Sequence, residues 1–252
     1  MPSIKLPKEH LQRAVELLLK KGFQKRDVQN AYASLTNGKA YITLYPSGSV
    51  LLQGDYPESL KDEILALVQA EGVLVGCDEA GKGDVFGPLV VCCALIRPEN
   101  FHKVLELAPK DSKKIQDREL FKKLPMLERC VEFYCKVLEP LELNRLHREG
   151  KNLNRILDWA YRELIEEILS KEPSAKITVD AYSHRNPFGN LVSFEPKAEE
   201  KVEVACASMK ARAEFLRWLE KHNLPKGASK EVMELARKMK DRERYLKAFF
   251  LS

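Results

Sequence analysis

The stretch VLVGCDEAGKGDVFGPLVVCCALI, residues 73–96, places a glycine-rich loop between two apolar segments. The segment VLVGCD is typical of a short buried strand, and GPLVVCCALI predicts a second strand that can pair with the first through the loop. Residues 76–83 match a phosphate-binding P-loop except at the last position, where Gly83 replaces the required Ser or Thr. The stretch is therefore either a nucleotide-binding loop or a different site at the end of a strand.

The nucleotide-binding interpretation is the weaker one. A P-loop leads into a helix whose N-terminus helps to hold phosphate, whereas this loop leads into VFGP and then a β-branched strand. The hydroxyl that binds magnesium is missing, and two carboxylates, Asp78 and Glu79, would repel a bare phosphate. We therefore expect no nucleotide cofactor and keep an ATPase only as a third alternative.

The adjacent acids predict a metal site instead. Asp78 ends a strand, and because strand side chains alternate between faces, a break after it is needed to turn Glu79 toward the same site. A second strand-like segment, KITVDAY, also ends in a carboxylate, Asp180. Ligands gather at the carboxyl ends of strands in α/β sheets, and oxygen ligands suit Mg²⁺ or Mn²⁺. An acidic pair alone is ordinary turn chemistry, but Asp180 shifts the balance toward a metal-binding cleft.

Length and composition exclude several classes of protein. The 252 residues are 44% hydrophobic and 31% charged, which is typical of a globular chain with its own core. No apolar run is long enough to span a bilayer and the N-terminus lacks a signal-peptide core, so we expect a cytoplasmic protein with no membrane partner. The six cysteines form no C-x-x-C pair, and we expect them to be buried, reduced and free of zinc.

The positive charge is concentrated at the C-terminus. The whole chain carries a net charge of +5, and residues 221–252 alone contain nine Lys or Arg against four Asp or Glu. Four lysines also flank the predicted metal site, at positions 82, 110, 113 and 114. A metal site beside lysines suggests a phosphodiester substrate. For the tail, a solvated helical face and a phosphate-binding surface remain equally open.

The pattern of secondary structure changes near residue 71. Before it, two helices enclose a segment of strands and turns, without any catalytic cluster. After it lie five strand-like segments, with helical sequence after the third and after the fifth. They lie at residues 73–78, 87–96, 128–138, 175–182 and 190–196. We predict an N-terminal domain at residues 1–71 and a catalytic domain of α/β class at residues 72–252.

Five segments taken in order form a more specific pattern. They are DEAGKGDVFGPLVV (78–91), DSKK (111–114), ITVDAY (177–182), FEPKAE (194–199) and ACASMKARAEFL (205–216). Together they resemble the type 2 ribonucleases H, and the resemblance covers most of residues 73–224. Within that group the chain is most similar to ribonuclease HIII, because GKGD is followed by FGP and a separate N-terminal domain is present.

The resemblance implies a fold, a reaction and cofactors. The family has an RNase H-like fold, a mixed sheet flanked by helices, and cleaves the RNA strand of RNA/DNA hybrids to 3′-hydroxyl and 5′-phosphate ends with Mg²⁺ or Mn²⁺. Asp78, Glu79 and Asp180 match its catalytic, metal-binding carboxylates. The N-terminal domain resembles the TATA-binding-protein-like domain that binds the hybrid. Removing residues 1–71 should then leave a folded nuclease with weaker affinity.

The resemblance also assigns substrate contacts. The loop residues Gly81, Lys82 and Gly83 match the family's backbone contacts to ribose 2′-hydroxyls, and Ser112 and Lys113 would lie near the cleft. This chemistry is reasonable because the 2′-hydroxyl separates RNA from DNA, and a loop without Cβ atoms lets the main chain approach it.

One position departs from the family pattern. Aligning the segment ASMKA with the ribonuclease HII sequence puts Leu216 where that sibling has an aspartate. The nearest acid is Glu214, about half a helical turn earlier. We assign Glu214 as the fourth catalytic acid, with Glu199 or Glu203 as the next candidates.

Two alternatives stay open for the function. The chain could be a ribonuclease HII-like enzyme that acts at single embedded ribonucleotides, or a non-catalytic protein that binds hybrids or duplexes. The retained carboxylates argue against the second, because acids weaken phosphate binding unless a metal is present. We expect a monomer.

Overall fold

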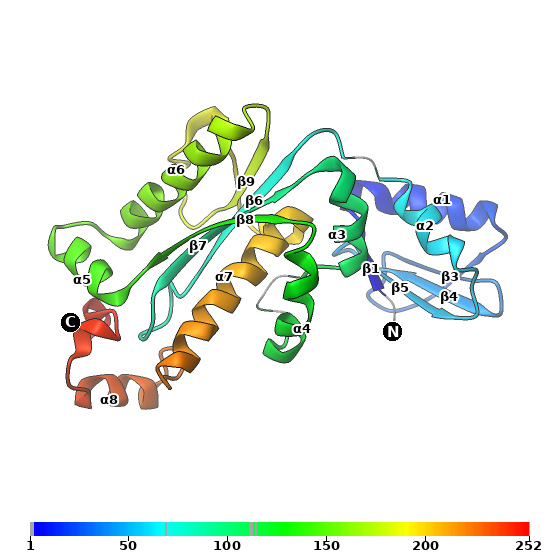
Figure 1. Cartoon of the computed structure of the whole chain (residues 1–252). Helices are drawn as coiled ribbons and strands as arrows, with labels where there is room; N and C mark the ends of the chain where they lie inside the picture. The colour runs from blue at the N-terminus through cyan, green and yellow to red at the C-terminus, as the bar shows by residue number, and fades with distance from the viewer. Residues whose placement is uncertain (1–2, 69, 111–112, 114, 252) are drawn as a thin grey trace.

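Two five-stranded sheets organise the chain, one in each of the two predicted domains (Figure 1). The coordinates are a computed structural model that describes residues 3–68, 70–110, 113 and 115–251. The N-terminal sheet is antiparallel with the order β1-β5-β4-β3-β2. Its strands are β1 (Ser3–Lys5), β2 (Gln24–Arg26), β3 (Ala33–Thr36), β4 (Ala40–Leu44) and β5 (Ser49–Gly54).

Two helices cover one face of the N-terminal sheet. They are α1 (Leu11–Lys20), which follows the 3₁₀ turn η1 (Lys8–His10), and α2 (Ser59–Leu65). The apolar residues of α1 recur at helical spacing, so Leu11, Ala14 and Leu18 are buried together on the sheet. The second helix ends at Leu65. Within the described residues, no helix lies on the opposite face of this sheet (Figure 1).

The second sheet is mixed, as the RNase H-like fold class requires. Its order is β10-β9-β6-β7-β8, with β6, β9 and β10 parallel and β7 and β8 antiparallel to their neighbours. The strands are β6 (Leu74–Ala80), β7 (Leu89–Ile96), β8 (Glu132–Leu138), β9 (Lys176–Asp180) and β10 (Ser193–Glu195). The expected mixed α/β architecture is therefore confirmed.

Helices lie on both faces of the second sheet, with α6 on one side and α7 on the other (Figure 1). The α-helices are α3 (Phe101–Leu107), α4 (Asp117–Leu127), α5 (Pro140–Arg148), α6 (Leu153–Lys171), α7 (Val202–Lys221) and α8 (Lys230–Lys238). The 3₁₀ turns are η2 (Pro98–Asn100), η4 (Gly189–Leu191), η5 (Ala198–Glu200), η6 (Arg242–Arg244) and η7 (Ala248–Phe250). A Cβ at Gly76 would lie 2.2 Å from the backbone nitrogen of Val204, so this glycine lets β6 touch α7.

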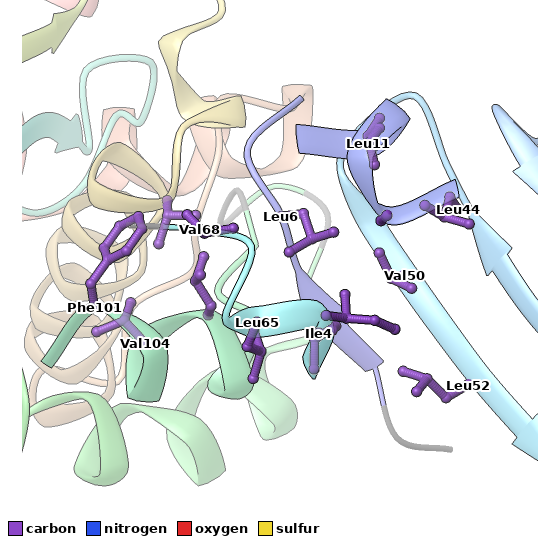
Figure 2. Close-up of a cluster of buried hydrophobic side chains, with 14 of the residues drawn as sticks. Ile4, Leu6, Leu11, Leu44, Val50, Leu52, Leu65, Val68, Phe101 and Val104 are labelled. Carbon is purple, nitrogen blue, oxygen red and sulfur yellow. The ribbon is translucent and has the colours of Figure 1, made fainter. Parts of the chain in front are cut away.

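The two units share one apolar core (Figure 2). Ile4 of β1 and Leu65 at the end of α2 belong to the same buried cluster as Phe101 and Val104 of α3. The boundary near residue 71 stays a prediction, but the cluster crosses it. Deleting residues 1–71 would expose Phe101 and Val104 to water, so truncation is a poor test of what the N-terminal unit does.

The expectation that all six cysteines are reduced is wrong for four of them, although Cys77, Cys92 and Cys93 are buried as expected. Register places Cys77 directly opposite Cys93 and Cys92 opposite Cys135, and both pairs form disulfides with Cα atoms 4.1 Å apart. Cys130 and Cys206 are the free thiols, and both are buried as expected. The spacing of cysteines in the sequence does not reveal which of them face each other across a strand pair. Only the register of β6, β7 and β8 shows which cysteines lie opposite each other.

Among the described residues, no helix combines the length and the apolar character needed to cross a bilayer.

Candidate active site

The two adjacent carboxylates sit on a continuous strand. β6 runs through Asp78 and Glu79 to Ala80, so the expected break after Asp78 is absent. Strand alternation therefore sends the two side chains to opposite faces of the sheet. Asp78 shares a face with Gly76, against α7, whereas Glu79 points toward α6. The acids thus flank the end of one strand instead of lying on one side of it.

The third carboxylate lies on the neighbouring strand. β9 is parallel to β6 and pairs with it up to Cys77 opposite Val179, so Asp180 ends its strand beside Asp78. This is the edge of the sheet at which two parallel strands present their carboxyl ends. The structure therefore places Asp78, Glu79 and Asp180, the three acids that the sequence singles out, at the ends of two neighbouring strands, where their charges act on one another.

Each carboxylate is held by a donor from a different element. Asp78 Oδ1 accepts the Glu79 amide at 2.8 Å, and the Ser208 hydroxyl of α7 donates to the same side chain. Glu79 Oε2 accepts the phenol of Tyr161, on α6, at 2.6 Å. Asp180 Oδ1 accepts the amide of Ala198, in η5, at 2.9 Å. Both covering helices therefore fix the orientation of the acids.

Burial and mutual repulsion disfavour ionisation of this group. Desolvation, followed by the charges of Glu79 and Asp180, raises the pKa of Asp78 well above its usual value. Burial likewise raises the pKa of Glu79, with the Tyr161 hydrogen bond opposing it. Burial also raises the pKa of Asp180 to about 6, and the nearby Glu199 carboxyl adds to that shift. A cluster of buried carboxylates with raised pKa values is typical of a functional site.

The oxygen donors of this group suit a hard divalent cation, although the side chains do not form a closed shell. In the described part of the chain, no three His, Cys, Asp or Glu side chains lie close enough together to hold a metal ion. Asp78, Glu79 and Asp180 are each bonded to a protein donor and repel one another. A cation would remove that repulsion, so the donor set fits Mg²⁺ or Mn²⁺, and the ligand assignment stays a prediction.

The structure describes both lysines among the predicted substrate residues, but not Ser112. Lys82 Nζ donates to the carbonyl of Tyr182 at 3.0 Å, and its charge lowers the pKa of Glu79 against the effect of burial. The exposed Lys113 acts electrostatically on both Glu79 and Asp180, which places it near the acids. Ser112 lies outside the described residues, as do Asp111 and Lys114 of the same motif.

The glycine-rich loop has an open tip. A Cβ placed on Gly83 would meet no atom within 4 Å, whereas one on Gly81 would lie 2.2 Å from the carbonyl oxygen of Pro88. Gly81 also has a positive φ of 88°, which side chains rarely adopt. The loop base therefore demands glycine for its shape, and the tip is free to approach a ligand.

The structure does not bring Glu214 to the other acids. Its carboxylate pairs with Lys210 and Arg217 at 2.8 Å each, and although burial opposes the shift, these partners lower its pKa. Glu199 is better placed, because its side chain lies within hydrogen-bonding reach of Asp180. Glu203 is buried and lines a cavity of about 1130 Å³ beside the N-terminal unit.

Two contacts to the acids were missed by the sequence interpretation. Tyr161 bonds Glu79 from the middle of α6, where its position in the apolar pattern marks it only as core. Ser208 belongs to the ACAS motif, so the pattern contained a signal for it, but the sequence does not show which acid it contacts. Both depend on how a helix lies across the sheet.

Sequence comparisons identify related proteins over the whole length. A family model described as Ribonuclease HII matches residues 75–234. Ribonuclease HIII of Aquifex aeolicus (strain VF5) is 38% identical over 256 residues, which cover 99% of this chain and 99% of the relative. Ribonuclease HIII of Chlamydia pneumoniae is 30% identical over 257 residues, which cover 88% of this chain and 84% of the relative.

Solved structures give the same result. The crystal structure of Aquifex aeolicus RNase H3 is similar with a TM-score of 0.67 and 37% identity, over 99% of this chain and 100% of that chain. The structure of Bst-RNase HIII in complex with Mn²⁺ is similar with a TM-score of 0.67 and 25% identity, over 99% and 95% of the two chains.

Proposed function

The chain belongs to the ribonuclease HIII family of type 2 ribonucleases H, and we propose that it cleaves the RNA strand of RNA/DNA hybrids to 3′-hydroxyl and 5′-phosphate ends. Enzymes of this family are endoribonucleases that depend on divalent metal ions. The observation that carries the proposal is the meeting of Asp78, Glu79 and Asp180 at the carboxyl ends of two parallel strands. We propose a monomeric, cytoplasmic enzyme.

The three carboxylates would hold one or two Mg²⁺ or Mn²⁺ ions. A divalent ion held there would supply an activated water and would stabilise the leaving oxygen of the scissile phosphodiester. Tyr161 and Ser208 keep Glu79 and Asp78 oriented from opposite faces of the sheet. Lys113, being exposed next to the acids, is suited to contact a flanking phosphate.

The glycine loop supplies the selection of RNA. Its tip at Gly83 is open, so backbone groups of Gly81, Lys82 and Gly83 can come close to a ribose. Only the 2′-hydroxyl distinguishes the RNA strand from DNA at a given step. Because Lys82 is bonded to Tyr182, we assign its side chain to shaping the loop and its backbone to the substrate.

A cleavage assay tests the proposed function. The wild-type chain is incubated with a uniform RNA/DNA hybrid, and separately with duplex DNA that contains one ribonucleotide, in Mg²⁺, Mn²⁺ or EDTA. We expect cuts in the RNA strand of the hybrid with either metal and none in EDTA, because the buried acids need a cation to act together.

The same assay separates the alternatives. Cleavage confined to the single ribonucleotide would make the chain a ribonuclease HII-like enzyme. Hybrid binding without cleavage in either metal would leave the non-catalytic binding protein as the better description.

The bare face of the N-terminal sheet is the proposed hybrid-binding surface. Register aligns Thr36, Tyr41 and Gln53 in one row and Ser34, Thr43 and Leu51 in the next. These residues lie on the face opposite the buried Ile42 and Leu44, which no helix of the described residues covers. Ser34 and Thr43 are buried within this face and bond to each other, so Thr36, Tyr41 and Gln53 form its accessible row. Arg26 lies with its guanidinium 4.8 Å from the centroid of the Tyr41 ring. An aromatic ring among hydroxyl and guanidinium groups suits a nucleic-acid backbone.

Tyr41→Ala tests this surface without disturbing the shared core. The ring is 37% exposed, and its loss should weaken hybrid binding roughly tenfold, within the usual range for an aromatic nucleic-acid contact. Fluorescence anisotropy measures Kd, and steady-state kinetics should show a raised KM with an unchanged kcat.

Tyr32→Ala is the matched control for Tyr41→Ala. That tyrosine is 46% exposed in the same unit, but its hydroxyl donates to Gln12 of α1. If the two variants raised the Kd for the hybrid equally, the result would contradict a role of the sheet face in hybrid binding.

A further inference from the structure

The C-terminal segment, residues 242–248, packs directly against residues 84–87, in the second half of the glycine loop that joins β6 to β7. The Gly87 amide donates to the carbonyl of Tyr245 at 2.9 Å, and the Lys247 amide donates to the carbonyl of Val85 at 2.9 Å. These bonds form an antiparallel bridge between Phe86 and Leu246. Two segments that are far apart in sequence, with Phe86 and Lys247 separated by 161 positions, are thus joined like neighbouring strands.

The side chain of Lys247 lies at the centre of this junction between the C-terminal segment and the glycine loop. It is fully buried, and its Nζ donates to the carbonyl oxygens of Asp84 at 2.8 Å, Phe86 at 3.2 Å and Gly87 at 2.7 Å. Three acceptors match the three donors of an ammonium group. All three belong to the glycine loop, so one side chain fixes the path of four consecutive residues.

Burying this amine carries a free-energy cost. Desolvation lowers the pKa of Lys247 to about 7, although the charge of Asp84 opposes the shift. An apolar side chain of the same length would fill the space without that desolvation. The lysine therefore has a role beyond packing, and its bonds show that the role concerns the loop.

The tail that carries Lys247 is itself anchored to the body of the domain. Asn144 of α5 is buried, and its Nδ2 donates to the carbonyls of Glu243 at 3.2 Å and Leu246 at 2.8 Å. Its Oδ1 accepts the Ala248 amide at 2.8 Å. The position of the ammonium is thus set in part by Asn144 of α5, whose hydrogen bonds go to the tail.

The other side of the loop base rests on α7. The ring of Phe215 lies 3.0 Å from the position of a Cβ on Gly81, and the Lys247 ammonium lies 6.0 Å from the centroid of the same ring. The base of the loop is therefore held by α7 and by the tail, while Gly83 at the tip is open. A firmly held base is what gives an open tip a defined position.

We propose that Lys247 is a positioning residue for ribose recognition, holding the glycine loop so that its tip meets the 2′-hydroxyl of the RNA strand. The proposal rests on the proposed function, since it takes the substrate to be RNA. It gives the basic tail a specific task, which is structural support of the loop from inside the protein instead of a surface contact to phosphate.

Lys247→Met tests the proposal, with Lys240→Met as the control. Lys240 is exposed, so this change removes the same charge without touching the loop. The readout is kcat/KM on a hybrid and on the same hybrid with one 2′-deoxynucleotide beside the cleaved phosphate. We expect Lys247→Met to lower kcat/KM on the hybrid roughly 10- to 100-fold, as for other losses of positioning, and on the deoxy substrate much less. The ratio between the substrates therefore falls toward one.

A merely structural role would give a different result. Equal losses on both substrates, or no loss on either, would overturn the proposal. If Lys247→Met does not fold, Asn144→Ala takes its place, because it loosens the tail without contacting the loop. It should shift the substrate ratio in the same direction, and an unchanged ratio would count against the proposal.

Hydrogen exchange on the wild-type protein gives an independent readout. The amides of Gly87 and Lys247, which bond across the junction, should show the same protection factor after correction for their intrinsic exchange rates, because they open together. Distinct protection factors would show that the loop opens without the tail and would contradict the proposal. This measurement needs no substrate, so a chain that fails to cleave hybrids would contradict the proposed function and leave this test valid.

Discussion

Asp78→Asn is expected to abolish cleavage, with kcat lowered at least ~1000-fold, while hybrid affinity stays within about threefold of wild type. The carboxylate is 8% exposed, and its position at the end of β6 beside Asp180 makes it the most central of the three acids. An amide of the same shape cannot replace a charged oxygen ligand. Affinity for the hybrid comes mainly from phosphate contacts elsewhere, so binding should survive.

The same variant should stabilise the metal-free protein. A carboxyl group whose pKa is raised in the folded state stabilises the fold at low pH, where it is protonated. This stabilisation is lost as the pH rises from the pKa of the unfolded chain to the raised pKa of the folded chain. For Asp180 that window is from 3.8 to about 6, and the coupled Asp78 extends it upward. In EDTA at pH 8, Asp78→Asn should therefore melt at a higher temperature than wild type, with the difference shrinking toward pH 4.

Asp62→Asn is the control for this experiment, since it makes the same chemical change at an exposed position of α2. It should alter neither kcat nor the melting temperature. Full activity of Asp78→Asn in Mg²⁺ would remove the assignment of this site, and destabilisation in EDTA would show that the carboxylate contributes to the fold through its Ser208 contact.

The sequence predicts the elements that bear the chemistry because their signals are local. An apolar run ending in a carboxylate occurs at Asp78 and again at Asp180, and the carboxyl ends of parallel strands meet at one edge. Periodicity therefore suffices to pair two acids that are about 100 residues apart. The division into two units follows from the same patterns, whereas the mixed sheet is implied only by the family resemblance.

The features that the sequence does not predict depend on register and on packing between distant elements. Glu79 points toward α6 because β6 continues past Asp78, and no local signal distinguishes a continued strand from a turn there. The disulfides follow from cross-strand register. In the sequence, Lys247 is one of nine basic residues in the C-terminal tail, and nothing local marks it as buried. The structure shows that it is fully buried and that its Nζ donates to backbone carbonyls. Such partners leave no signal in a sequence, because every residue has a carbonyl group.

Glu199→Gln is expected to lower kcat roughly 100-fold, whereas Glu214→Gln should stay within about threefold of wild type. Glu214 is the acid nearest in sequence to the position at which ribonuclease HII has its aspartate. Nearness in sequence does not show which way a side chain points from the helix. In three dimensions the Glu199 carboxyl lies beside Asp180 and raises its pKa in addition to the larger effect of burial. Glu214 is instead neutralised by Lys210 and Arg217, which leaves little charge for a metal ion.

Two further readouts distinguish the roles of these acids. If Glu199 helps to hold a cation, Glu199→Gln should require a higher Mg²⁺ concentration for half-maximal rate, because one oxygen ligand carries less charge. Glu214→Gln should leave the Mg²⁺ dependence unchanged and lower the free energy of unfolding by about 0.5 to 1 kcal/mol, the usual contribution of such ion pairs. An inactive Glu214→Gln beside an active Glu199→Gln would reverse the assignment, and would mean that α7 turns its carboxylate toward the metal once the hybrid is bound.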